Sequence, residues 1–284
     1  MNPLRGARTH ACRVETRLDI LVAALFLVVL PLAAQPGPGA AKGKQAPRPA
    51  RQSAPVDLTG YWVSVISEDW RWRMVTPSVG DFAGLPLTPA ARREGNAWNP
   101  AADEASGNQC KAYGAAAVMR MPGRLHITWQ DDDTLKIETS EGQQTRLLHF
   151  RPVTNPAATN VAPPNTQPAR QGWSAAQWEP AVRGSGSPQA GLGATREGTR
   201  GRSLEVVTTN LLPGYLRKNG APHSANAVVK EFFDLSTERN GDTWFVVTTI
   251  VEDPPNLTEP FVTSTNFKKE ADGAKFKPAP CSAQ

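Results

Sequence analysis

The chain has 284 residues, of which 20% are charged and 39% hydrophobic, and a formal net charge of +5. Eight of its 31 basic residues but only two of its 26 acidic residues precede residue 57, which leaves 23 bases against 24 acids in residues 57–284. This near-neutral part lacks the electrostatic footprint that binding to a phosphate backbone requires, so we expect no nucleic-acid partner.

The N-terminus has the pattern of a secretory signal peptide. Four arginines within residues 1–19 precede the uncharged apolar run Ile20–Leu30, which ends on Pro31-Leu32-Ala33-Ala34. This order predicts a signal peptide over residues 1–34 and an exported, periplasmic or secreted, protein. The run is shorter than the roughly 20 apolar residues of a spanning helix, so we expect no integral membrane span in the mature chain. Retention of the segment as an N-terminal anchor is the alternative.

The composition then divides the rest of the chain. Residues 35–56 are rich in Pro, Ala, Gly and Lys, which predicts a flexible tail. A single domain follows over residues 57–284, interrupted at 152–202 by a Pro- and Gly-rich stretch that we expect to be a long irregular insert. Within it, Trp173–Trp178 has two tryptophans spaced to share a helical face or to dock on the domain.

Several segments alternate apolar and polar residues, the pattern of half-buried strands. Hairpin turns are predicted at Asp131-Asp132-Asp133, at Glu141-Gly142 and, most clearly, at Asn240-Gly241. Consecutive hairpins predict an all-β fold, an antiparallel meander of about eight strands that closes into a barrel, with one or two short helices. The expected strands cover residues 57–63, 124–130, 134–139, 145–150, 204–209, 228–233, 244–251 and 261–268.

Only one segment is clearly helical. Thr88 is a suitable N-cap, Pro89 a suitable first residue, and the helix continues from Ala90 to Trp98 before Pro100, where it would cap one mouth of the barrel. A second candidate, residues 112–121, is rich in Ala but interrupted by Gly, and its conformation is left open.

Two cysteines follow the signal segment, Cys110 and Cys281. An even pair in an exported chain predicts a disulfide between them; two unlinked buried thiols are the alternative. A redox-active role is not favoured, because the chain has no Cys-x-x-Cys spacing.

The first expected strand contains Gly60-Tyr61-Trp62, a Gly-x-Trp sequence that resembles the opening motif of lipocalins and related calycin barrels. The resemblance implies a structural role for Trp62, which would close the barrel floor beneath a basic residue from the last strand, here Lys268 or Lys269. Residues 251–254 and 258–261 also resemble uncharacterised exported bacterial proteins with lipocalin-like barrels. That resemblance implies a fold but no known activity.

Two basic and aromatic clusters are candidate ligand contacts. If residues 67–74 are extended, Arg71 and Arg73 point to one side and both tryptophans to the other. This predicts a carboxylate clamp beside a stacking wall formed by Trp70 or Trp72. The alternative is a strand whose tryptophans pack in the core while its arginines pair in solvent. The second cluster contains Tyr215 and Arg217 and is expected at a barrel rim; an ordinary solvated turn is its alternative.

Two further candidates lie on the strand expected over residues 124–130. Trp129 would supply an apolar wall for a ligand, and His126 would be an acid–base group if its face is the barrel interior. A structural or solvated histidine is the alternative. The chain has no metal-ligand spacing and no Gly-rich phosphate loop, so no metal or nucleotide cofactor is expected.

Three functions are consistent with this pattern. The leading hypothesis is an exported lipocalin-like barrel that binds a small, partly apolar and anionic molecule. An enzyme on the same barrel would place a carboxylate or His126 inside the cavity. A cell-envelope protein that binds a protein partner would instead have a filled barrel and an exposed apolar patch.

Overall fold

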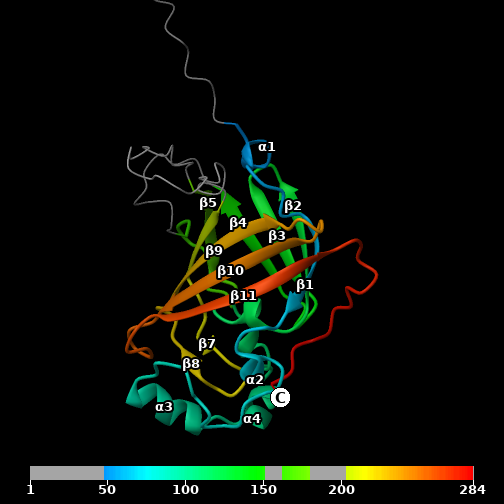
Figure 1. Cartoon of the computed structure of the whole chain (residues 1–284). Coiled ribbons are helices and arrows are strands. Elements are labelled where there is room, and N and C mark those ends of the chain that lie inside the picture. The colour runs from blue at the N-terminus through cyan, green and yellow to red at the C-terminus, as the bar shows by residue number, and fades with distance from the viewer. Residues whose placement is uncertain (1–47, 151–161, 180–202, 284) are drawn as a thin grey trace, which may run out of the picture. The chain divides into compact units, whose positions relative to one another are not determined.

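The structure, a computed structural model, describes residues 48–150, 162–179 and 203–283 (Figure 1). The predicted signal peptide, most of the predicted tail and two parts of the predicted insert lie outside these residues. In the described part of the chain, no helix is both long and apolar enough to cross a membrane.

Nine strands form a closed barrel in the order β1-β11-β10-β9-β6-β5-β4-β3-β2 (Figure 1). Eight of the neighbouring pairs are antiparallel, and only β4 and β5 are parallel. The predicted all-β barrel is therefore confirmed, with nine strands and one parallel pair. The strands are β1 Gly60–Val65, β2 Arg124–Asp131, β3 Thr134–Thr139, β4 Thr145–Phe150, β5 Trp173–Trp178, β6 Leu204–Thr209, β9 Val228–Thr237, β10 Thr243–Glu252 and β11 Phe261–Glu270.

Each predicted hairpin turn joins two neighbouring strands. β2 pairs with β3 across the aspartate turn, β3 with β4 across Glu141-Gly142, and β9 with β10 across Asn240-Gly241. Gly142 and Gly241 have φ values of 74° and 87°, which L side chains rarely adopt. The turn chemistry of the sequence thus accounts for three of the eight antiparallel pairs.

The structure differs from the sequence prediction in two irregular segments. Trp173–Trp178 is not a helix: it forms β5, hydrogen-bonded between β4 and β6 inside the predicted insert, with Trp178 packed against the core. The predicted tail contains a short helix, α1 (Ala50–Ser53), whose first residue is buried. Backbone N–H groups of Ala50 and Arg51 donate to the β2–β3 turn, to Asp133 Oδ1 at 2.7 Å and to Asp132 O at 2.9 Å. These bonds order a segment whose composition predicted a flexible chain.

Short helices gather at the end of the barrel away from α1 (Figure 1). The predicted helix is confirmed as α3 (Pro89–Asn96), with Thr88 Oγ1 accepting from Ala91 N at 3.2 Å. The segment left open, residues 112–121, contains single 3₁₀ turns rather than one helix. The remaining elements here are α2 Trp70–Arg73, α4 Pro100–Ala105, η1 Lys111–Tyr113, η2 Val118–Arg120, β7 Gly214–Tyr215 and β8 Pro222–His223.

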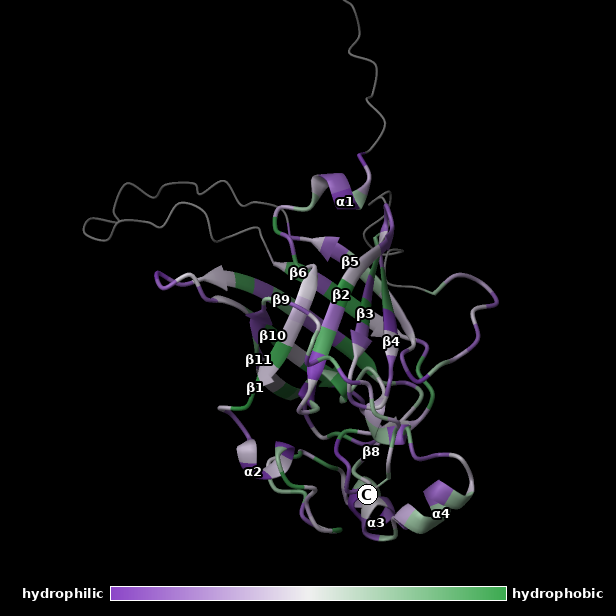
Figure 2. Ribbon diagram, turned by 90° about the vertical axis from the view of Figure 1, so that its right-hand side faces the viewer, coloured by the Kyte–Doolittle hydropathy of each residue, from purple (hydrophilic) through white to green (hydrophobic). Residues whose placement is uncertain are grey.

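The strands alternate hydrophobic and hydrophilic residues (Figure 2), and the inward residues form two apolar clusters. The first fills the barrel and includes Trp62, Phe233 and Phe245. The second lies at the helical end, where Ala91 of α3 belongs to the same cluster as Val229 of β9. As expected, α3 therefore helps to cap one barrel mouth.

A buried polar layer separates the two apolar clusters. Arg146 on β4 and Glu231 on β9 form a bidentate ion pair, with Nη2–Oε2 at 2.6 Å and Nη1–Oε1 at 3.1 Å, and both side chains are 0% exposed. Thr208 Oγ1 accepts from Arg146 Nη2 at 3.3 Å and lies 2.7 Å from Ser174 Oγ. On β9 the glutamate lies between inward-facing residues of the two clusters. The barrel interior is thus occupied by the protein's own side chains.

The predicted disulfide is present. Cys110 and Cys281 are bonded, with a Cα–Cα distance of 5.1 Å. It fastens the end of residues 271–283, which we call the C-terminal strap, to the helical end of the barrel, while Phe276 packs against Tyr61 and His126 on the outer face. The strap also forms a backbone hydrogen bond from Ala279 N to Ser140 O at 2.8 Å and accepts one from the Tyr113 hydroxyl at Ser282 O, at 3.3 Å.

Trp62, the tryptophan of the Gly-x-Trp sequence, belongs to the barrel interior. Its side chain is fully buried in the first apolar cluster, and its Nε1 donates to Leu58 O at 2.9 Å. Lys269 Nζ lies 5.3 Å from the centre of the indole ring. Lys268 instead pairs with Asp242 at 2.7 Å, so the basic residue over Trp62 is Lys269.

Stability should fall as the pH falls below about 6.5, because of the buried imidazole of His223. Burial lowers the pKa of His223, against the opposing effects of the Ser224 carbonyl and Asp253. The unfolded chain therefore takes up a proton near pH 6.5, where the folded protein does not, and protonation favours unfolding. Urea unfolding of wild type and His223→Gln at pH 7.5 and 5.5 measures this. The variant should lose part of the pH dependence; an equal dependence in both proteins would contradict the prediction.

Candidate functional site

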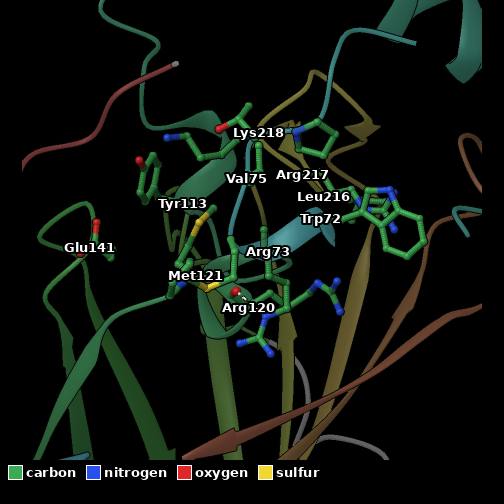
Figure 3. Close-up of a pocket in the computed structure, with 15 residues that line it drawn as sticks. Trp72, Arg73, Val75, Tyr113, Arg120, Met121, Glu141, Leu216, Arg217 and Lys218 are labelled. Atoms are coloured by element: carbon green, nitrogen blue, oxygen red, sulfur yellow. Dashed lines mark hydrogen bonds between the residues drawn. The ribbon is translucent and has the colours of Figure 1, made fainter. Parts of the chain in front are cut away.

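A pocket of about 270 Å³ lies at the helical end of the barrel, beyond the ends of the strands (Figure 3). Its walls come from α2 and the residues after it, the η1–η2 segment, the β3–β4 turn and the residues after β7. The lining includes four basic side chains and one acidic side chain: Arg73, Arg120, Arg217, Lys218 and Glu141.

Arg73 is positioned by α2, which corrects the prediction of an extended segment. In a helix, residues two apart point to nearly opposite sides, so Arg73 is buried while Arg71 is exposed. The Arg73 guanidinium donates from Nε to Arg120 O at 2.9 Å and from Nη2 to Ser64 Oγ at 3.1 Å, and it pairs with Glu68. It is therefore held in one orientation and has a counter-charge.

Arg120, at the end of η2, is the second buried cation. Its Nη2 donates to Asp69 Oδ2 at 2.8 Å. Its Nη1 is buried and donates to no acceptor among the described residues. The guanidinium carbon lies 5.5 Å from the centre of the Phe261 ring, so this unsatisfied donor is buried against the second apolar cluster.

Arg217, in the residues after β7, is the third buried cation and differs from the other two. Its Nη1 donates to Ala83 O at 2.7 Å, and its guanidinium carbon lies 5.0 Å from the centre of the Trp72 ring. Within the described ranges, no carboxylate lies within 4.0 Å of this guanidinium, and its buried Nε has no acceptor. The pocket therefore contains a buried positive charge without a direct counter-ion.

The three guanidinium groups are close enough to affect one another. Arg73, Arg120 and Arg217 are only 7%, 6% and 5% exposed. Burial, opposed by nearby carboxylates and reinforced by the charge of Arg120, lowers the pKa of both Arg73 and Arg217 to about 10. Both side chains remain protonated at neutral pH, so the free pocket holds repelling charges that a bound anion would neutralise.

The rest of the wall is apolar or aromatic. Tyr113 forms one side, where Lys218 Nζ lies 5.6 Å from the centre of its ring, and Met121 and Leu216 contribute aliphatic surface (Figure 3). Tyr113 packs closely on Gly142, where an added Cβ would lie 2.3 Å from the tyrosine ring. The pocket can thus hold an anionic group against the arginines and an apolar group against this wall.

The structure brings together only part of the predicted ligand site. Arg73 and Arg217 share the pocket, but Trp72 rather than Trp70 supplies the aromatic surface beside them. Trp70 is exposed, and Arg71 points outward to Asp81, at 3.4 Å. The alternation in residues 67–74 indicated arginine and tryptophan as contacts, but Trp70 and Arg71 point away from the pocket.

Tyr215 lies beside the pocket rather than in its lining. Its hydroxyl donates to Asp103 Oδ2 at 2.7 Å, and Asp103 also accepts from Trp98 Nε1 and Lys111 Nζ, each at 2.8 Å. Burial, then its bond to Asp103, raises the pKa of Tyr215 well above its usual value. Tyr215 therefore stays protonated and ties β7 to α4.

The two candidates on β2 lie away from this pocket. His126 is on the outer face, stacked on Tyr61 at 4.2 Å between ring centres, with Nδ1 3.1 Å from Glu138 Oε2. The hypothesis that its face is the barrel interior is wrong, because Leu125 and Ile127 occupy that side. Trp129 points inward and lines a second opening of about 370 Å³ with Val56, near α1.

Sequence reasoning missed Arg120 and Lys218 as members of this site. Arg120 ends an Ala-rich segment whose conformation was open, and nothing in its neighbours marks it as a pocket residue. Among the described residues, no group of three or more His, Cys, Asp or Glu side chains is placed to hold a metal ion.

Comparison with known proteins gives no match: no family model, no curated protein and no solved structure is similar to this chain. The resemblance to lipocalin-like proteins therefore stays a prediction.

Proposed function

We propose that this chain is an exported protein that binds a small, partly apolar anion in the pocket formed by Arg73, Arg120 and Arg217. The observation that carries this proposal is Arg217, a buried guanidinium without a direct carboxylate partner and with a donor that has no acceptor in the described structure. A buried charge is unfavourable unless it is paired and hydrogen-bonded. A site that keeps such a charge gains free energy when an anion binds.

The chemistry of the donors defines the class of ligand. Guanidinium groups donate in parallel to the two oxygens of a carboxylate or to phosphate oxygens, and such charge-assisted bonds are about twice as strong as neutral ones. Arg120 Nη1 and Arg217 Nε are buried donors without acceptors among the described residues, and each would have to turn toward the pocket to reach a ligand. The aromatic and aliphatic wall supports an apolar portion of the ligand.

The proposed site lies at the helical end, outside the barrel interior where a lipocalin-like protein would hold its ligand. The barrel interior is filled by an apolar cluster and the Arg146–Glu231 layer, so the pocket at the helical end is the better site. The interior does contain a carboxylate, Glu231, but it is engaged by Arg146, and His126 lies on the outer face. Export is supported by the disulfide, which suits an oxidising compartment, and by the N-terminal pattern.

A second candidate, an envelope protein that binds a partner, is favoured by one specific observation. The barrel is filled and several large apolar side chains are exposed near α2, as that hypothesis predicted.

Arg217→Gln should weaken anion binding by about tenfold to a hundredfold, the effect of losing a charge-assisted hydrogen bond of roughly 1.5–3 kcal/mol. Isothermal titration with hexanoate and with hexyl phosphate measures this on the oxidised protein. Arg71→Gln is the matched control, because it removes an equal charge from an exposed neighbour. It should leave the affinity unchanged.

Native mass spectrometry of the protein purified from its own host, without reductant, gives an independent test. A non-covalent mass released on unfolding is expected for wild type and should be lost in Arg217→Gln. Equal retention of that mass in the variant would place the ligand elsewhere and overturn the proposal.

A further inference from the structure

The most exposed apolar side chains of the described structure are concentrated in one short segment. Trp70, Met74, Val75 and Val79 are 63%, 59%, 65% and 46% exposed, and they lie within ten residues of one another. Only Leu212 and Val262 are comparable elsewhere in the described residues. We call residues 70–79 the apolar segment. Monomeric proteins seldom leave such a cluster in water without a use for it.

The apolar segment adjoins the cationic pocket. Met74 and Val75 are exposed and also line the pocket, and Val75 lies at its edge near Lys218 (Figure 3). The α2 helix at the start of the segment contributes Arg73 to the pocket floor. One short stretch of chain therefore carries both a buried cation and the exposed apolar side chains next to it.

We propose that the pocket takes the phosphate of an anionic phospholipid while the apolar segment enters the interface of the bilayer. This inference rests on the proposed anion-binding function and names the ligand: a lipid headgroup in a membrane surface. The protein would lie on the membrane through its helical end, with α1 directed away from the lipid (Figure 2).

Three physical arguments favour a membrane. A small soluble anion would occupy the arginines but leave Trp70 and Val79 in water, since neither side chain lines the pocket. Tryptophan is well suited to the membrane interface, where its ring is apolar and its N–H can bond to headgroups. The negative surface potential of an anionic leaflet attracts Arg and Lys side chains close to it.

The positive charge beside the apolar segment comes from the pocket. The exposed Arg71 is paired with Asp81 at 3.4 Å and so adds no net charge. Arg217 supplies a buried positive charge without a direct carboxylate partner. An anionic surface matches this combination better than an acidic protein groove, which would not bury the apolar side chains.

Vesicle co-sedimentation of the full oxidised protein tests the proposal. We expect binding to phosphatidylcholine vesicles that contain phosphatidylglycerol, and at least tenfold weaker binding to pure phosphatidylcholine. Trp70→Ser/Val79→Ser should reduce binding to the anionic vesicles about tenfold by the lost apolar burial, with unchanged affinity for hexyl phosphate. Val262→Ser is the matched control, because it removes an exposed valine outside the apolar segment and should bind as wild type does.

The outcomes separate this inference from the proposed function. Binding of hexyl phosphate without binding of anionic vesicles overturns the membrane inference and leaves the anion site standing. Equal vesicle binding by Trp70→Ser/Val79→Ser, or equal binding to neutral vesicles, also overturns it. If neither hexyl phosphate, hexanoate nor vesicles bind, both proposals fall.

Discussion

Replacing Glu231 with Gln should lower the free energy of unfolding by about 3–5 kcal/mol, because it leaves Arg146 charged and unpaired inside the barrel. Both side chains are fully buried, and Glu231 accepts from both terminal nitrogens of the guanidinium. Arg146 Nε already lacks a partner among the described residues, so the layer has no spare acceptor to take over. Urea unfolding followed by tryptophan fluorescence measures the change.

The paired substitution Arg146→Met/Glu231→Leu should be much less destabilising than Glu231→Gln alone. Removing both charges removes both desolvation penalties, and apolar side chains of similar volume can fill the space between the two clusters. Comparing the two single variants with the double gives the coupling between the side chains. A Glu231→Gln variant within about 1 kcal/mol of wild type would show that this ion pair does not stabilise the barrel.

Removal of the disulfide should be similarly costly, lowering the free energy of unfolding by about 5 kcal/mol. Cys110 and Cys281 are separated by 171 residues, and closing so large a loop strongly restricts the unfolded chain. The variant Cys110→Ser/Cys281→Ser should therefore unfold at lower urea than the oxidised wild type, in the absence of reductant.

Reduced wild type is the control for the two serine substitutions. It should unfold like the double variant, because both lack the same cross-link. The strap should also become sensitive to protease after reduction, since it is otherwise held by a few hydrogen bonds such as Ala279 N to Ser140 O. A reduced protein as stable as the oxidised one would contradict the expected role of the cross-link.

The hairpins were the most predictable part of the fold, because both their signals are local. Alternation identified β2, β3 and β4, and Asn240-Gly241 identified the turn between β9 and β10. β5 was missed because Trp173–Trp178 is short and lies in a Pro- and Gly-rich stretch. It also pairs in parallel with β4, from which it is separated along the chain, so no hairpin turn marks it. A closed ring of nine strands cannot alternate direction throughout, so one parallel pair is required; no local pattern shows where it falls.

The candidate site was only half predictable. Arg73 and Arg217 were chosen for their chemistry, and the structure places both in one pocket. Four residues, Trp70–Arg73, carry too few turns to distinguish a helix from a strand, so the sequence left Trp70 and Trp72 as alternatives, and Trp72 lines the pocket. Arg120 reaches the pocket through the packing of the η1–η2 segment, which is a tertiary effect that the sequence pattern does not encode.

Closure of the barrel by its first and last strands has a consequence for the order of folding. β1 pairs with β2 on one side and with β11 on the other, so the ring stays open until residues 261–270 are in place. A chain shortened before β11 would present two unpaired strand edges, on β1 and β10, ready to join other molecules. Pairing partners so far apart in the chain also favour slow folding. The barrel is therefore completed only when β1 pairs with β11. Premature arrest of synthesis should yield aggregates rather than a smaller stable domain.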